Sequence, residues 1–324
     1  ADFTYNTDFA QVEADQQQIN LTRFSLFFPE KREFFLENQG TFAFGGAGAG
    51  PFSGGGDTPV LFYSRRIGLS GSQEVPIQAG GRLTGRLGAF SLGVLDIRSD
   101  DEPVSGALAT NFTVARLKRD ILRRSAVGLL FTNRSVAATG VGSTQTYGVD
   151  GTLAFFTNLS INTYWARTQT SGLAGGEVSY RGQLDYGGDR YGVQLEHLLV
   201  GDNFNPEVGF VRRGDVATNF ASARFSPRMR QGRAVRQLTW QGQLDYITNA
   251  AGDVLEDRAV AGLFGVEFNS GDQLQISATR QYERLPSDFA ISRGVVVPAG
   301  GYSYQLVSAR YALAQQRMVN GNAS

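Results

Sequence analysis

The sequence predicts an all-β protein: an antiparallel transmembrane β-barrel of the outer-membrane type, with about 16 strands and an N-terminal segment that plugs or caps it. Two observations carry this prediction. Side chains alternate between apolar and polar over stretches of roughly ten residues or more, and short links rich in Asn, Asp and Gly separate these stretches. A third observation excludes membrane helices, because no apolar run approaches the ~18 residues that one requires.

The clearest alternation lies in Val235–Thr248. Leu238, Trp240, Leu244 and Tyr246 share one parity, and the other parity carries Gln237, Thr239, Gln241, Gln243 and Asp245. Successive side chains of a strand point to opposite faces, so one face is apolar and the other is polar. The same pattern predicts strands over residues 178–186, 191–199, 274–283 and 302–313.

A soluble sandwich also alternates, but its strands are shorter. The predicted strands are often ten to fourteen residues long, against a mode of ~5–6 in soluble proteins and ~9–11 for a membrane strand. Their apolar stripes also end in aromatic residues, as at Tyr180 and Tyr186, or Trp240 and Tyr246. Aromatic girdles at the two membrane interfaces are typical of barrels. We expect the short turns on one side of the membrane and the longer links on the other.

The composition narrows the function classes. The 30 basic and 30 acidic residues cancel, so nothing indicates the basic excess of a nucleic-acid-binding protein. The absence of cysteine excludes disulfides, zinc–thiolate sites and cysteine nucleophiles. The 41 glycines, nearly twice the ~7% of an average protein, suit turns and the bends that close a barrel.

Residues 1–58 differ from the rest and form the first predicted region. It holds a strand near residues 2–14, a segment rich in phenylalanine and charge over 21–38, and a glycine-rich linker. The second region, residues 59–324, is the barrel, and the lack of a terminal aromatic residue suggests that further strands follow it. Charged residues are costly facing lipid, so the segment belongs inside the barrel or across one mouth. The candidate plug or gate residues are Arg23, Phe27, Phe28, Glu30, Lys31, Arg32 and Glu33.

Three segments of the sequence resemble a bacterial family of unknown function. They are Asn6-Thr-Asp-Phe-Ala-Gln-Val-Glu-Ala-Asp15, the run from Asn20 to Glu37, and the run from Asn205 to Gly214. In that family an outer-membrane-type barrel follows a carbohydrate-binding, family-nine-like module. The resemblance implies this architecture, but it supplies neither a reaction nor a substrate.

Catalytic and metal-binding signals are weak. His197 is the only histidine, and it shares parity with Tyr191, Val193 and Leu195, so we expect it to face lipid or an interface. Its parity is opposite to that of Ser179, which does not favour a hydrolase site. The acidic stretches at 100–102 and 202–207 match no complete calcium loop, and we expect no catalytic residue, no cofactor and no metal.

These features predict a channel or transport component of the bacterial outer membrane. Polar side chains suit a lumen that passes polar solutes, and the resemblance adds glycans as one class of cargo. The alternatives are a structural or assembly anchor for other envelope proteins and a barrel-embedded hydrolase. The expected partners are the lipid bilayer, lipopolysaccharide and other envelope proteins, and nucleic acid is not among them. The candidate lumen-lining residues are Arg181, Gln183, Asp185, Gln237, Gln241 and Gln243.

Overall fold

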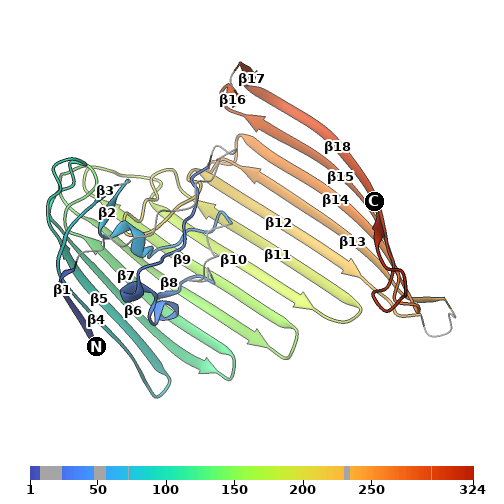
Figure 1. Cartoon of the computed structure of the whole chain (residues 1–324), viewed down its shortest axis with the longest axis horizontal. Helices are drawn as coiled ribbons and strands as arrows, with labels where there is room; N and C mark the ends of the chain where they lie inside the picture. The colour runs from blue at the N-terminus through green and yellow to red at the C-terminus, as the bar shows by residue number, and fades with distance from the viewer. Residues whose placement is uncertain (8–23, 47–55, 72, 230–233, 293) are drawn as a thin grey trace. The chain divides into compact units, whose positions relative to one another are not determined.

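A computed structural model describes residues 1–7, 24–46, 56–71, 73–229, 234–292 and 294–324. Within these residues the protein is all-β, with mostly antiparallel strands in one large sheet and only short helical turns (Figure 1). These turns are α1 (Glu33–Leu36), η1 (Gln39–Phe42) and η3 (Ser64–Arg66). No helix among the described residues is long and apolar enough to cross a membrane.

The large sheet contains fifteen strands within the described residues, and each neighbours the next in the order of the chain. They are β1 (Asp2–Thr7), β4 (Ile77–Leu87), β5 (Phe90–Ser99), β6 (Thr110–Leu122), β7 (Ser125–Arg134), β8 (Thr144–Phe155), β9 (Leu159–Thr170), β10 (Val178–Gly187), β11 (Tyr191–Val200), β12 (Val216–Phe225), β13 (Val235–Thr248), β14 (Leu255–Phe268), β15 (Gln273–Leu285), β18 (Gly300–Ala312) and β19 (Asn322–Ala323). Two small hairpins lie outside it, β2 (Leu69–Ser70) with β3 (Gln73–Glu74) and β16 (Phe289–Ser292) with β17 (Val295–Val297).

The predicted strands are confirmed closely. β13 has the predicted bounds, and β10, β11, β15 and β18 differ from prediction by one or two residues at an end. The sheet has two edges, β1 and β19, and no pairing joins them among the described residues. A closed barrel of about 16 strands therefore stays a prediction. The first predicted strand is described only as far as Thr7, and the rest of it lies outside the described residues.

The contacts divide the chain into two compact units. Unit 1 is Ala1–Ala154, Ile161–Gly182 and Leu198–Val216, and unit 2 is Phe155–Ser160, Gln183–His197 and Ala217–Ser324. The predicted boundary near residue 58 falls inside unit 1.

Short and long links alternate along the sheet. Because consecutive strands are antiparallel, the short links lie mainly at one end of the strands and the longer links at the other. In unit 1 the links 88–89 and 123–124 are short, whereas 100–109 and 135–143 join the other ends. In unit 2 the links 156–158, 188–190 and 269–272 are short, and 286–299 joins the other ends. One short turn lies on the other side from the one predicted. The Asn, Gly and Asp residues of Asn249–Asp253 predict that this turn lies with the other short turns, but it joins the strand ends that carry the long links, because β13 runs toward those ends.

Unit 1 has a hydrophobic core on one face of its strands. Register places Leu95 beside Val114 and Ile97 beside Phe112, and all four side chains are buried. The opposite face of the same strands is also apolar but exposed, with Leu92 opposite Leu117 and Leu117 opposite Leu129. Over these residues the strands of unit 1 therefore carry apolar side chains on both faces. The alternation of polar and apolar residues did not predict this.

Unit 2 keeps the predicted alternation. Trp240, Leu244 and Tyr246 are 42%, 40% and 37% exposed on one face of β13, while Gln241 and Gln243 on the other face are half-buried. Register extends the apolar face through Phe264 opposite Trp240. Exposed apolar side chains in long strands need an apolar surrounding that the described part of unit 2 does not supply.

Candidate functional site

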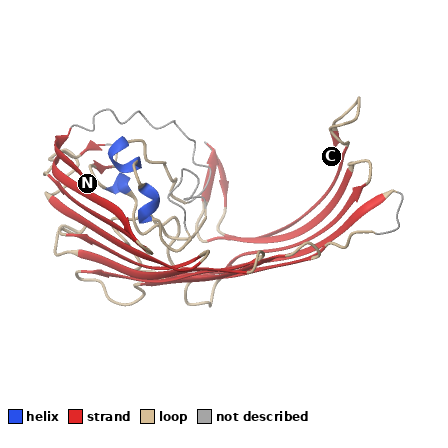
Figure 2. Ribbon diagram, turned by 90° about the horizontal axis from the view of Figure 1, so that it is seen from below, coloured by secondary structure: helices blue, strands red, loops and turns tan. Residues whose placement is uncertain are grey.

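The segment 24–46, called the N-terminal segment below, lies against the core face of unit 1. Figure 2 shows α1 and η1 in blue against the strands of this unit. Phe35, Phe42 and Phe44 of the segment are buried. Glycine makes the approach possible, because a Cβ added at Gly93 would lie 2.9 Å from the Phe42 ring, and one added at Gly148 would lie 2.7 Å from the Phe44 ring.

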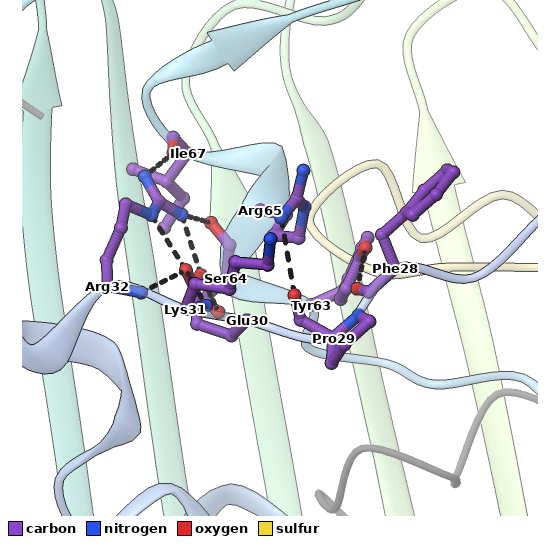
Figure 3. A network of polar contacts seen from close by, with 9 residues as sticks. All are labelled: Phe28, Pro29, Glu30, Lys31, Arg32, Tyr63, Ser64, Arg65 and Ile67. Carbon is purple, nitrogen blue, oxygen red and sulfur yellow. Dashed lines mark hydrogen bonds and ion pairs between the residues drawn. The ribbon is translucent and has the colours of Figure 1, made fainter. Parts of the chain in front are cut away.

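A buried ion pair organises the start of the segment (Figure 3). The Glu30 carboxylate accepts hydrogen bonds from Arg32 Nη2 at 2.7 Å and Nε at 2.8 Å, and from the Ser64 hydroxyl at 2.5 Å. The Arg32 guanidinium also donates to the Ile67 carbonyl at 2.7 Å and to the Ser64 carbonyl at 2.9 Å. Arg32 thus joins the segment to residues 64–67, and a charge buried this deeply requires such partners.

The network also determines the ionisation of its carboxylate. Burial raises the pKa of Glu30, but the hydrogen bonds and positive charge of Arg32, with the Ser64 hydroxyl, outweigh burial and hold this pKa below its ordinary value of 4.5. Glu30 is therefore ionised at neutral pH.

Two arginines from the strands hold the rest of the segment. Arg82 of β4 donates to the carboxylates of Asp2 at 2.7 Å and Glu37 at 2.6 Å, and also to the Phe34 carbonyl. Arg116 of β6 forms a bidentate pair with Asp150 at 2.7 and 2.8 Å, and Asp150 also accepts the Gly45 backbone N–H at 3.0 Å. Bidentate guanidinium–carboxylate pairs fix orientation as well as charge.

The fold brings two of the family-like stretches together. The Phe27 ring, from the run Asn20 to Glu37, lies 5.3 Å from the ring of Phe210, from the run Asn205 to Gly214, and 4.9 Å from that of Tyr63. The guanidiniums of Arg212 and Arg213 lie 5.5 and 5.1 Å from the centre of the Phe24 ring. Backbone hydrogen bonds between Val60 and Phe210, at 2.7 and 2.9 Å, complete the junction.

A polar cavity of about 370 Å³ lies in unit 1 near the ends joined by long links. Its lining includes Arg66, Ser99, Thr110, Arg134 and Glu207. Arg134 pairs with Glu207 at 3.1 Å, and this carboxylate also accepts the Ala138 N–H at 2.7 Å. Paired charges and hydroxyls make the cavity suitable for water and small polar solutes.

The predicted plug residues share one segment but not one environment. Glu30 and Arg32 are buried, Phe27, Phe28 and Lys31 are half-buried, and Glu33 is exposed. Arg23 lies outside the described residues. The predictions missed Arg82, Arg116 and Ser64. The sequence did contain one signal for the two arginines: each is a charged residue inside a strand, and a buried charge requires a partner of opposite charge.

The predicted lumen-lining residues follow their parity. In β10, Arg181, Gln183 and Asp185 are half-buried, whereas Tyr180 and Tyr186 on the opposite face are exposed. In β13, Gln237, Gln241 and Gln243 share the half-buried face.

His197 lies where parity placed it, exposed with Tyr191, Val193 and Leu195 on one face of β11. Its Nδ1 is 2.8 Å from the Asn219 side-chain oxygen. Ser179 is buried in unit 1, where its hydroxyl contacts the Tyr164 hydroxyl at 2.9 Å. Within the described residues no group of three or more His, Cys, Asp or Glu side chains is placed to hold a metal ion.

Comparison with known proteins matches residues 1–84 to a family described as a domain of unknown function (DUF5916). No curated protein matches the chain. Among solved structures, the chain is similar to OccK10 (OpdN) of Pseudomonas aeruginosa at 14% identity and a TM-score of 0.34, over 75% of this chain and 71% of that one.

Proposed function

We propose that the chain forms a β-barrel channel for polar solutes in the bacterial outer membrane, with the N-terminal segment narrowing its passage. The observation that carries the proposal is the division of the unit 2 strands into an exposed apolar face and a half-buried polar face. Membrane strands present lipid on alternate residues and water on the others. We assign no catalytic role to His197.

The apolar face of unit 1 supports the same conclusion. Leu92, Leu117, Leu129, Val149 and Trp165 form an exposed apolar surface. On the same face and nearer the long links, Thr113 and Asn111 donate hydrogen bonds to Asp96 at 2.6 and 3.1 Å. A change from apolar to polar side chains along one face is expected where a strand leaves the hydrocarbon layer.

Closure of the sheet is part of this proposal. An open sheet in a bilayer would leave backbone groups of its edges without partners, at a cost of several kcal/mol for each group. The lipid bilayer and lipopolysaccharide are the proposed surroundings, and other envelope proteins are proposed partners. We also propose that a carbohydrate-binding module precedes these residues in the protein and that glycans are among the solutes it passes.

Planar-bilayer recording tests the channel. The purified chain should insert and give discrete conductance steps, and Gln243→Glu on the polar face should shift ion selectivity toward cations. Leu244→Arg on the apolar face should instead impair insertion, because an arginine at mid-bilayer costs ~2–4 kcal/mol. Insertion without any conductance would overturn the channel and favour an anchor for envelope proteins.

The narrowing role requires a variant that loosens the segment without deleting it, because Phe35, Phe42 and Phe44 belong to the core of unit 1. Ser64→Ala removes one hydrogen bond from Glu30, and Arg32→Met removes the ion pair. Both should raise single-channel conductance, whereas Glu33→Gln, at an exposed position, should not.

A disulfide lock makes the same test reversible. Cysteines at positions 46 and 162 would place their Cβ atoms 3.6 Å apart, a distance suitable for a disulfide, although a side chain at position 46 is strained because φ there is +74°. The chain has no other cysteine. In the Arg32→Met background, oxidation of Gly46→Cys/Asn162→Cys should lower the conductance again, and reduction should restore it. If the channels insert but Ser64→Ala, Arg32→Met and oxidation of the cysteine pair all leave the conductance unchanged, the segment caps the barrel without narrowing its passage.

A further inference from the structure

We propose that the apolar face of unit 2 carries a binding site for an anionic phospholipid, at the strand ends joined by short links. The site consists of a row of aromatic rings, an arginine laid over two of them, and a groove along the row. It rests on the proposed function, because it requires this face to lie in a bilayer.

The aromatic row crosses four adjacent strands. Tyr191 of β11 stacks on Phe225 of β12 with ring centres 5.3 Å apart, and Phe225 stacks on Trp240 of β13 at 5.8 Å. Trp240 in turn lies 5.6 Å from Phe264 of β14. Register explains the alignment, since Phe225 pairs with Trp240 and Trp240 with Phe264. Mutual packing of the rings makes the row a rigid wall.

The groove beside this wall has a volume of about 740 Å³, within the ~300–1,000 Å³ of small-molecule sites. Its floor is low because Ala223, Gly242, Gly262 and Ala278 follow one another in register across the strands. A Cβ added at Gly242 or Gly262 would meet no atom within 4 Å. The described chain therefore leaves the groove open, and its apolar walls, completed by Val193 and Ile276, suit an acyl chain.

Arg190 supplies the charge at the end of the groove. Its guanidinium lies 5.6 Å from the Tyr191 ring centre and 5.2 Å from that of Phe225. Within the described residues no carboxylate forms an ion pair with it, whereas the nearby Arg228 pairs with Asp189 at 2.7 Å. A guanidinium that lies over aromatic rings and pairs with no carboxylate keeps N–H groups available to phosphate oxygens.

Unit 1 repeats this arrangement on a smaller scale. Arg119 of β6 lies 5.2 Å from the Phe90 ring centre, on the exposed apolar face and also beside a short link. No ion pair neutralises Arg119 within the described residues. An arginine over an aromatic ring thus marks the short-link end of the apolar face in each unit, at the level where lipid phosphates would lie.

The ligand that fits this site joins one negative charge to a long apolar chain. A phosphatidylglycerol meets both requirements, because its phosphate would accept hydrogen bonds from Arg190 while an acyl chain fills the groove. A zwitterionic phosphatidylcholine presents the same phosphate together with a cation, which Arg190 repels. The site should therefore prefer the anionic lipid.

Fluorescence quenching tests this preference. Trp165→Phe leaves Trp240 as the only tryptophan, and the whole chain is inserted into phosphatidylcholine vesicles containing a few mole per cent of a lipid with brominated acyl chains. Brominated phosphatidylglycerol should quench Trp240 several-fold more than brominated phosphatidylcholine at equal content. Arg190→Gln should remove most of the difference. Arg236→Gln is the matched control, since Arg236 lies in the same strand as Trp240 but is paired with Glu267 at 2.9 Å.

The outcomes separate the lipid site from the channel. Equal quenching by the two lipids, or an undiminished preference in Arg190→Gln, would overturn the lipid site while the membrane-facing surface stands. Absence of quenching by either lipid would overturn the membrane-facing surface itself, and the proposed function with it.

Discussion

Unit 1 and unit 2 use the same kind of strand in different ways. In unit 1 one face of the strands is apolar and covered by the N-terminal segment, so that Leu95, Ile97 and Val114 are almost fully buried. In unit 2 the corresponding strands turn Gln241 and Gln243 to a face that no described segment covers. Among the buried hydrophobic residues of the described parts of the chain, only Ala217 and Ala314 belong to unit 2.

The difference shows what stabilises each unit. Unit 1 has a hydrophobic core of its own, joined by buried arginines, as in a soluble protein. Unit 2 has strand pairing and stacked rings but almost no core, so its exposed apolar face requires an apolar surrounding. We therefore expect a substitution to have different consequences in the two units.

The largest expected effect comes from a charge on the covered face. Ile97→Arg buries an unpaired guanidinium and should destabilise the folded chain by several kcal/mol. Gln243→Arg, on the polar face of unit 2, should stay within ~0.5 kcal/mol. Guanidinium unfolding of the detergent-folded chain measures both. Similar losses would mean that the polar face of unit 2 is as tightly covered as the core of unit 1.

Loss of the Arg32 guanidinium should have the next largest effect. Arg32→Met leaves the Glu30 carboxylate buried with only the Ser64 hydroxyl and nearby backbone N–H groups, which should cost ~3–5 kcal/mol. The double variant Glu30→Gln/Arg32→Met should recover much of this loss. The same unfolding titration applies, with exposed Glu33→Gln as the control. A loss below ~1 kcal/mol would show that the network contributes little to unit 1.

Acid should weaken the same network by a smaller amount, because a protonated carboxyl still accepts hydrogen bonds from Arg32. The pKa of Glu30 is lower in the folded chain than its ordinary 4.5. The stability that this carboxylate contributes is therefore present above about pH 4.5 and is lost as the pH falls through the folded pKa. Unfolding curves of the wild type and of Glu30→Gln should converge with falling pH. Curves that stay parallel would contradict the assignment.

The smallest effects should have opposite signs in the two units. Gly148→Ala would place its Cβ 2.7 Å from the Phe44 ring, and this overpacking should cost ~1–3 kcal/mol. Gly242→Ala meets no atom within 4 Å and should stabilise β13 by ~0.5–1 kcal/mol. Thermal unfolding in one detergent compares the pair directly. Destabilisation by Gly242→Ala would mean that the groove floor is already packed.

Much of the strand architecture followed from the sequence alone. The bounds of β13 and the exposed parity of Trp240, Leu244 and Tyr246 were predictable because alternation is a local property of an extended chain. The exposed side of His197 followed from the same parity. The link at 249–254 was misassigned because its composition does not show at which strand end it lies.

Only the tertiary structure decided which faces are covered and which charges meet. Ser64 and Ile67 lie more than thirty residues from their partners in the Glu30–Arg32 network, and Asp150 lies 105 residues from Gly45. No local period encodes such contacts, because they depend on how the chain returns to the sheet. The apolar residues on both faces of β5 have the same cause: one face received the N-terminal segment, and the other stayed exposed. Parity assigns a residue to a face, but what lies against that face is determined by the rest of the chain.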